Sequence, residues 1–193
     1  MGSQWGRDKV YLRAKYEGYR SRAAYKLIEI QRRFNIIRRS DNIIDLGAAP
    51  GSWLQVEQTL TDGKVLGIDL SLIPPMDNIE TIVGDLTDPE VQAQAREMLG
   101  SVSVVVSDAS PKLSGHKSYD QARAIALGRE CLNFACSVLK PGGNFVVKSF
   151  QGTDFNDLLD DVRQHFHSVR TFRVTATRKG STEIYIIAKN FTG

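Results

Sequence analysis

The chain has 193 residues, of which 41% are hydrophobic and 24% charged, a composition typical of one globular domain that buries roughly 70% of its unfolded surface. It has no run of the roughly 20 apolar residues that a membrane span needs, and its amino terminus shows neither an apolar signal core nor a myristoylation pattern. Cys131, Cys136 and the three histidines fit no zinc or redox spacing. We therefore expect two buried, reduced thiols, a cytoplasmic location and no metal site.

The net charge of +3 is distributed unevenly along the chain. Residues 1–40 hold eleven Lys or Arg against three acids, a surplus of eight positive charges, whereas the remaining residues hold fourteen against nineteen. Four tyrosines stand among the basic residues of this amino-terminal segment. Basic residues that alternate with aromatic ones are typical of nucleic-acid contact, and the alternative is a solubilising tail.

The predicted elements alternate between helix and strand. Residues 21–37 have apolar residues near helical spacing, with Ser21 as a plausible cap, and Asp88 caps a second helix that has Pro89 at its first position. In chain order the pattern gives a helix within SRAAYKLIEIQRRFNII, strand NIID, helix 51–60, strands KVLGIDL and TIVGDL, helix 88–99, strand SVSVVVSD, helix 118–139 ended by a KPGG turn, strand NFVVKSF, helix 154–166, and β-rich segments SVRTFRVT and EIYIIAK. This order predicts an α/β fold with a doubly wound, mostly parallel sheet that ends in an antiparallel hairpin.

The stretch DLGAAPGSW, from Asp45 to Trp53, follows the first predicted strand, where doubly wound sheets bind ligands. Gly47 and Gly51 leave the turn without side chains, so a ligand can lie against the backbone. The spacing is not the G-x-G-x-x-G of dinucleotide folds, and Asp45 would repel a pyrophosphate. A ligand with positive charge and no phosphate fits better, and S-adenosylmethionine is such a ligand. The alternative is a purely structural turn.

Three further carboxylates follow the next three strands. Asp69 is placed to accept the hydroxyls of a ribose, Asp85 to reach an adenine amino group, and Asp108 ends the fourth strand. Each acid alone is more often a turn residue. Because parallel strands end at one edge of a sheet, the four acids together predict a binding edge.

In this order, the motifs SRAAYKLIEI, DLGAAPGSW, GIDL, GDL, SDASPKLSG, PGGNFVVKSFQG and STEIYIIA resemble the FtsJ-type methyltransferases, which transfer methyl from S-adenosylmethionine to a ribose 2′-hydroxyl of RNA. The resemblance runs from about Tyr19 to Ala188. Its compact form is similar to the enzymes that methylate a uridine in large-subunit ribosomal RNA. Two departures are Ser52, where many relatives have a second glycine, and the SDASPKLSG loop, where many bacterial members have a D-M-A-P form.

The resemblance implies a Rossmann-like class I methyltransferase fold, with a seven-stranded, mostly parallel sheet, an antiparallel carboxyl-terminal strand and helices on both faces. We expect a single domain over residues 1–193, with a basic RNA-binding segment over about 1–40. The implied donor-binding residues are Asp45, Gly47, Gly51, Trp53, Asp69, Asp85, Leu86 and Asp108. The implied catalytic residues are Lys26, Asp108, Lys148 and Glu183. The expected RNA contacts are Arg7, Lys9, Arg13, Lys15, Arg20 and Arg22.

The sequence itself makes Lys148 unusual, because it follows the apolar NFVV of a central strand and desolvating an ammonium is costly. The alternative is a lysine that reaches solvent at the strand end. We take Lys148 as the general base, which Asp108 would orient, while Lys26 would supply a second cation near the target. By composition alone Lys26 would be an ordinary solvated lysine. Which lysine is deprotonated stays open.

The expected partner is large-subunit ribosomal RNA bound by a monomer, with no metal and no membrane. Three alternatives remain. The target is instead tRNA, or the chain is an inactive RNA-binding assembly factor on a methyltransferase scaffold, or it is an NAD-dependent dehydrogenase. The missing G-x-G-x-x-G argues against the last.

Overall fold

A computed structural model describes residues 9–112, 114–177 and 180–193. The elements are α1 (Lys9–Tyr16), α2 (Ala24–Phe34), β1 (Ile43–Leu46), α3 (Ser52–Leu60), β2 (Val65–Asp69), β3 (Glu80–Val83), α4 (Pro89–Leu99), β4 (Val102–Ser107), α5 (Lys117–Val138), β5 (Leu139–Phe150), α6 (Phe155–His165), β6 (Phe166–Phe172) and β7 (Glu183–Phe191). Within these residues the strands form one seven-stranded sheet in the order β3-β2-β1-β4-β5-β7-β6. All neighbours are parallel except β7, which runs antiparallel to both β5 and β6.

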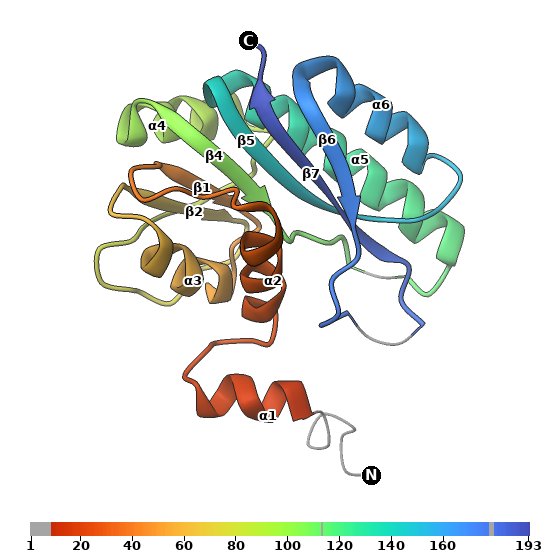
Figure 1. Cartoon of the computed structure of the whole chain (residues 1–193), viewed down its shortest axis with the longest axis horizontal. Coiled ribbons are helices and arrows are strands. Elements are labelled where there is room, and N and C mark those ends of the chain that lie inside the picture. Colours follow the sequence, from red (N-terminus) through yellow and green to blue (C-terminus); the bar gives the residue numbers. More distant parts are fainter. Residues whose placement is uncertain (1–8, 113, 178–179) are drawn as a thin grey trace.

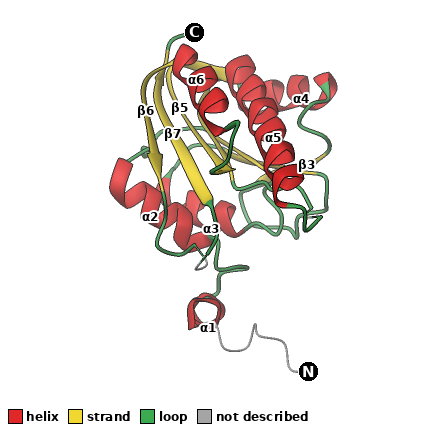
Figure 2. Cartoon of the chain, turned by 90° about the vertical axis from the view of Figure 1, so that its right-hand side faces the viewer, coloured by secondary structure: helices red, strands yellow, loops and turns green. Residues whose placement is uncertain are grey.

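The sheet has helices on both faces, as the sequence predicts. Figures 1 and 2 show α4, α5 and α6 on one face and α2 and α3 on the other. The side chains of each strand alternate between these layers. Ile44 and Leu46 of β1 pack in the core under α4–α6, whereas Ile43 packs in the core under α2 and α3. Every residue of β1 and β4 is buried, as expected for central strands of a parallel sheet.

The same alternation brings polar residues of different strands onto one face. Val146 of β5 and Ile187 of β7 belong to the core under α2 and α3. Lys148 lies two residues after Val146, and Tyr185 and Glu183 lie two and four residues before Ile187. All three side chains therefore point toward the layer that holds α2, near the edge at which the parallel strands end.

Most predicted boundaries are correct to within a few residues. Asp88 caps α4 as predicted, because its Oδ1 accepts a hydrogen bond from the Glu90 amide over 2.9 Å. Ser21 is not the cap of α2: the helix begins at Ala24, and the Ser21 hydroxyl accepts from the Ala23 amide and contacts the Ser52 hydroxyl instead. The KPGG segment lies within β5, where the pairing with β4 shifts register between Val102 and Val104.

The structure differs from the predicted elements in the order of its last strands and in one additional helix near the amino terminus. The last two strands form the expected antiparallel pair, but β7 inserts between β5 and β6, so the chain's last strand is internal. The helix α1 was not predicted, and it stands apart from the sheet (Figure 1).

Other sequence expectations concern membranes, metals and thiols. Within the part of the chain that the structure describes, helices long and apolar enough to cross a membrane are lacking. His, Cys, Asp and Glu residues in the same part form no group suited to a metal ion. Cys131 is buried as predicted, whereas Cys136 is only partly buried.

Candidate active site

The turn after β1 is tight because glycine occupies two positions with left-handed backbone. Gly47 has φ +72° and Gly51 has φ +99°, a region that other residues rarely adopt. A Cβ at Gly47 would lie 2.5 Å from Cβ of Ala109, and a Cβ at Gly51 would lie 2.6 Å from Nη1 of Arg20. The glycines were predicted to leave room for a ligand. In the structure they let Ala109 and the Arg20 side chain approach the turn closely.

A hollow of about 220 Å³ opens beside this turn, and we call it the rim hollow. Its lining residues are Ser21, Ala23, Asp45, Gly47, Ala48, Ala49, Pro50, Ser52, Trp53 and Asp108. They come from the segment before α2, from β1 and the turn after it, from the first residues of α3, and from the position directly after β4. The indole nitrogen of Trp53 donates to the Ala23 carbonyl over 2.8 Å, which fixes one wall.

Asp45 is the least satisfied polar side chain of the rim hollow. It is 1% exposed, and its Oδ2 has no hydrogen-bond partner. Burial raises the pKa of Asp45 well above its usual value, and the negative charges of Glu57, Asp108 and Asp69 raise it further. A ligand that brings positive charge to this wall would relieve the repulsion and pair with the carboxylate.

The other predicted donor-binding residues stand farther from the hollow or are engaged in turns. Asp69 accepts from the Ala49 amide over 3.0 Å and from the Ser71 amide over 2.7 Å, so it holds the two loops that follow β1 and β2. Hydrogen bonds from the Thr87 amide and hydroxyl lower the pKa of Asp85, whose side chain is exposed. Leu86 packs against the core. Gly51, Asp69, Asp85 and Leu86 do not line the rim hollow.

The four predicted catalytic residues meet in one cluster, which we call the tetrad. Nζ of Lys26 lies 3.3 Å from Oδ1 of Asp108 and 2.9 Å from Oε1 of Glu183. Nζ of Lys148 lies 3.2 Å from the same Oδ1 of Asp108 and also donates to the Asp108 main-chain carbonyl. Lys26 and Lys148 are 8% and 9% exposed. The tetrad thus holds two buried lysines between two carboxylates, and Lys26 is not the solvated lysine that composition suggested.

Tyr185 belongs to this cluster, and the sequence analysis missed it. Its hydroxyl donates to Oδ1 of Asp108 over 2.6 Å and lies 3.4 Å from Oε1 of Glu183. Burial and the two neighbouring carboxylates raise the pKa of Tyr185 well above its usual value, so the phenol stays protonated and acts as a donor. The signal was present in the sequence, because Tyr185 lies two residues after Glu183 in a strand and must share its face.

A second residue that the sequence analysis missed is Glu57 of α3. It is fully buried, and both carboxylate oxygens lack a hydrogen-bond partner. Burial raises the pKa of Glu57 to about 8. Local sequence does not reveal this burial, because Glu57 lies in the ordinary helical segment LQVEQTL.

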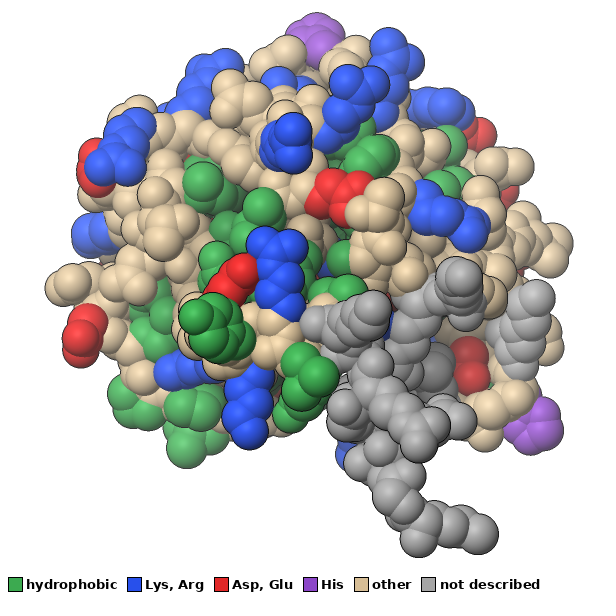
Figure 3. Space-filling view, turned by 60° about the horizontal axis from the view of Figure 1, so that its bottom comes forward, with side chains coloured by type: hydrophobic (Ala, Val, Ile, Leu, Met, Phe, Trp, Pro, Cys, Tyr) green, Lys and Arg blue, Asp and Glu red, His purple; other side chains and the backbone are tan. Residues whose placement is uncertain are grey.

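The predicted RNA contacts occupy different surroundings. Arg7 lies outside the described residues, as does the side chain of Lys9. Arg13 pairs with Glu17 over 2.7 Å and lies over the Tyr25 ring, whereas Lys15 is exposed. Figure 3, seen from the side that carries α1, shows Lys and Arg side chains spread across this face. Arg22 is partly buried, and Arg20 turns inward to backbone carbonyls.

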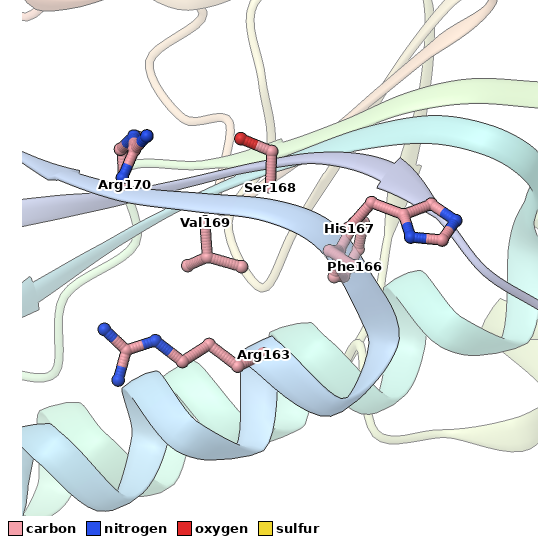
Figure 4. Close-up of a pocket in the computed structure, with 6 residues that line it drawn as sticks. All are labelled: Arg163, Phe166, His167, Ser168, Val169 and Arg170. Atoms are coloured by element: carbon pink, nitrogen blue, oxygen red, sulfur yellow. The ribbon is translucent and has the colours of Figure 1, made fainter.

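A further hollow, of about 330 Å³, lies between α6 and the edge strand β6 (Figure 4). Arg163, Phe166, His167, Ser168, Val169 and Arg170 line it. Phe166 pairs with Phe191, at the end of β7 that is opposite to Glu183. This hollow therefore lies away from the tetrad, and it contains none of the predicted site residues.

Two solved structures with the same fold are named as methyltransferases. A crystal structure named as a ribosomal RNA methyltransferase from Plasmodium falciparum aligns with a TM-score of 0.81 and 31% identity, over 91% of this chain and 100% of that one. A Streptococcus mutans protein named as a methyltransferase in complex with SAH aligns with a TM-score of 0.56 over 85% of this chain and 97% of that one, and at 14% identity it supports the fold alone. The architecture is therefore that of a Rossmann-like methyltransferase.

Sequence relatives narrow this class to one family. The FtsJ-like methyltransferase family model matches residues 19–191. A protein of Methanoregula boonei named ribosomal RNA large subunit methyltransferase E is 74% identical over the full length of both chains. A protein of the same name from Methanosphaerula palustris is 66% identical over all of this chain and 95% of that one. The chain belongs to the FtsJ-like methyltransferase family, which confirms the resemblance noted in the sequence.

Proposed function

We propose that this protein transfers a methyl group from S-adenosylmethionine to the 2′-hydroxyl of a uridine in large-subunit ribosomal RNA. The observation that carries the proposal is the tetrad, in which two buried lysines and two carboxylates stand beside a hollow walled by Asp45 and Asp108. The names of the relatives support large-subunit ribosomal RNA as the substrate, in preference to tRNA.

The residues of the rim hollow fit the proposed donor. S-adenosylmethionine supplies a methyl group on a sulfonium, and it also carries an ammonium. Asp45 has a buried oxygen without a partner, which suits an ammonium or a sulfonium. The carboxylate that suits this donor would repel the pyrophosphate of NAD, and this observation disfavours a dehydrogenase.

The tetrad can remove the proton of a ribose hydroxyl. We assign Lys148 Nζ as the atom that accepts this proton, because the Asp108 carboxylate and carbonyl hold it in a fixed position. Asp108 stabilises the ammonium that forms. Lys26, held between Asp108 and Glu183, places a second positive charge near the target ribose. A positioned base of this kind contributes about 10²–10⁴-fold to the rate.

The basic amino-terminal segment would hold the RNA. The exposed Lys15 is available to phosphate oxygens, and such contacts position a target without reading its sequence. The nucleotide must also turn out of its stack to bring its ribose to the tetrad. We assign RNA binding to residues 1–40 as a unit, within a single methyltransferase domain.

The test compares Lys148→Met with Lys140→Met, an exposed lysine of the same strand. Purified protein is incubated with labelled S-adenosylmethionine and either large-subunit ribosomal RNA or tRNA, and the modified position is mapped. We expect Lys148→Met to lower single-turnover methylation of ribosomal RNA by about 10²-fold or more, with the donor Kd unchanged. Lys140→Met should behave as the unaltered protein.

Three results would contradict the proposal in different ways. Retained activity in Lys148→Met removes this residue from the role of base. Labelling of tRNA alone changes the substrate. Donor binding without methylation of any RNA would instead support an inactive assembly factor.

A further inference from the structure

Arg20 lies in the basic segment, yet its guanidinium faces the protein. Nη1 donates to the Pro50 carbonyl over 2.9 Å and to the Pro74 carbonyl over 2.8 Å, and Nη2 donates to the Pro75 carbonyl over 2.9 Å. Pro50 belongs to the turn after β1, and Pro74 and Pro75 belong to the loop after β2. One side chain therefore joins the two loops that follow the first two strands.

The backbone around Arg20 is anchored to the same region. The Arg20 amide donates to Oε1 of Gln55 in α3 over 2.8 Å, and Nε2 of Gln55 donates to the Gly18 carbonyl over 2.9 Å. Gly51 is the point of closest approach, because a Cβ there would lie 2.6 Å from Nη1 of Arg20 and 3.3 Å from Sδ of Met76. The side chain is thus held against the turn after β1 and the loop of residues 70–79, while its backbone is held to α3.

This geometry requires a guanidinium. Its planar fork presents several donors in fixed directions, whereas the ammonium of lysine is a compact charge that cannot span three carbonyls held by different loops. Three of the five N–H donors of this guanidinium, both on Nη1 and one on Nη2, are taken by Pro50, Pro74 and Pro75, so a phosphate could approach Nη1 only by displacing these contacts.

We propose that Arg20 is a positioning residue of the donor pocket and not an RNA contact. It fastens the loop of residues 70–79 against the turn of residues 47–51, and that turn lines the rim hollow. The expected effect of Arg20 on donor binding rests on the proposed function, whereas the attachment of the loop follows from the hydrogen bonds alone.

The experiment compares Arg20→Lys and Arg20→Ala with Lys15→Ala, the exposed basic residue of the same segment. S-adenosylhomocysteine alone is the probe for calorimetry without RNA. We expect its Kd to rise at least about fivefold in both Arg20 variants, the scale set by the loss of one or two hydrogen bonds. Under steady-state conditions the KM for S-adenosylmethionine should rise while kcat stays within about twofold. Lys15→Ala should leave the Kd for S-adenosylhomocysteine unchanged.

In RNA binding the roles of the variants should be reversed: Lys15→Ala should have an effect and the Arg20 variants should not. Loss of one phosphate contact lowers the slope of log K against log salt by about 0.7–0.9, so Lys15→Ala should lower it by that amount, whereas Arg20→Lys and Arg20→Ala should leave it unchanged. The proposal is overturned if the Arg20 variants lower the salt slope and keep the Kd for S-adenosylhomocysteine.

Amide hydrogen exchange of residues 70–79, measured without any ligand, tests the fastening itself. We expect faster exchange there in both Arg20 variants, with the exchange of β4 unchanged as a sign of an intact fold. Unchanged exchange in residues 70–79 would overturn the proposal. Because this measurement needs no donor, it separates failure of the Arg20 assignment from failure of the proposed methyl transfer.

Discussion

Tyr185 holds the carboxylates of the tetrad through one hydroxyl. Its position in β7, two residues after Glu183, brings the phenol under Lys26, whose Nζ lies 5.7 Å from the ring centroid. The phenol donates to Asp108 and also approaches Glu183. It therefore keeps Asp108 oriented toward both lysines.

Tyr185→Phe removes this donor and leaves the ring in place. We expect a loss of about 1–2 kcal/mol in the free energy of unfolding, because Asp108 loses a charge-assisted hydrogen bond, and a lower kcat with an unchanged donor Kd. Urea unfolding and single-turnover kinetics measure the two effects. Tyr119→Phe, an exposed tyrosine in α5, serves as the matched control. Equal behaviour of the two variants would show that the hydroxyl has no such role.

Glu57 makes stability depend on pH. Its pKa is about 8 in the folded protein and 4.5 as an ordinary glutamate. Between these values the native state binds the proton and the unfolded state does not, so the free energy of unfolding falls as pH rises, by about 1.4 kcal/mol per pH unit. Below about pH 4.5 both states are protonated and this dependence vanishes.

Glu57→Gln keeps the shape and removes the titration. We expect the loss of stability between about pH 6 and pH 8 to shrink by roughly 2 kcal/mol relative to the unaltered protein. Urea unfolding at several pH values measures it, and Glu97→Gln, on the exposed side of α4, should leave the loss unchanged. Parallel pH profiles for Glu57→Gln and the unaltered protein would contradict the assignment.

At the scale of elements, steric crowding as well as backbone conformation requires glycine in the turn between β1 and α3. Gly47 and Gly100 both have positive φ, at +72° and +66°. A Cβ at Gly47 would meet Ala109, whereas a Cβ at Gly100 would meet nothing within 4 Å. The two glycines therefore separate the cost of strain from the cost of a clash.

Gly100→Ala should cost about 1–3 kcal/mol of folding free energy, from its strained backbone (φ +66°, ψ −101°) alone. Gly47→Ala should cost more, because Ala109 must move, and its neighbour Asp108 should move with it. We expect Gly47→Ala to lose methyl transfer while Gly100→Ala retains it. Thermal unfolding and activity measurements compare the pair, and equal losses of stability in the two variants would rule out the clash.

The whole molecule is electrically asymmetric, with a surplus of eight positive charges in residues 1–40 and a deficit of five in the rest. We expect RNA affinity to fall steeply with salt, by about a hundredfold between roughly 50 and 200 mM, if four of these cations each neutralise one phosphate. Binding of S-adenosylhomocysteine, which has no net charge, should change little over the same range. A flat salt response of RNA binding would argue against the segment as the RNA contact.

The sequence by itself determined the layers and the edge at which the site lies. Alternating apolar strands and helices predict a doubly wound sheet, and Asp45, Asp69, Asp85 and Asp108 lie at or just after the ends of successive strands, where such sheets form binding edges. Lys148 was recognisable, since a lysine after NFVV stands out in a buried strand. These inferences need only local periodicity and chain order.

Only the tertiary structure decided which side chains meet. Lys26 becomes buried because α2 packs over the ends of β4 and β7, and neither strand is near it in sequence. Tyr185 reaches Asp108 because β7 inserts beside β5, and the Arg20 guanidinium lies against the protein because two distant loops offer it carbonyls. The physical reason is that burial, charge pairing and hydrogen-bond partners arise from contacts between segments far apart in the chain, which local spacing does not encode.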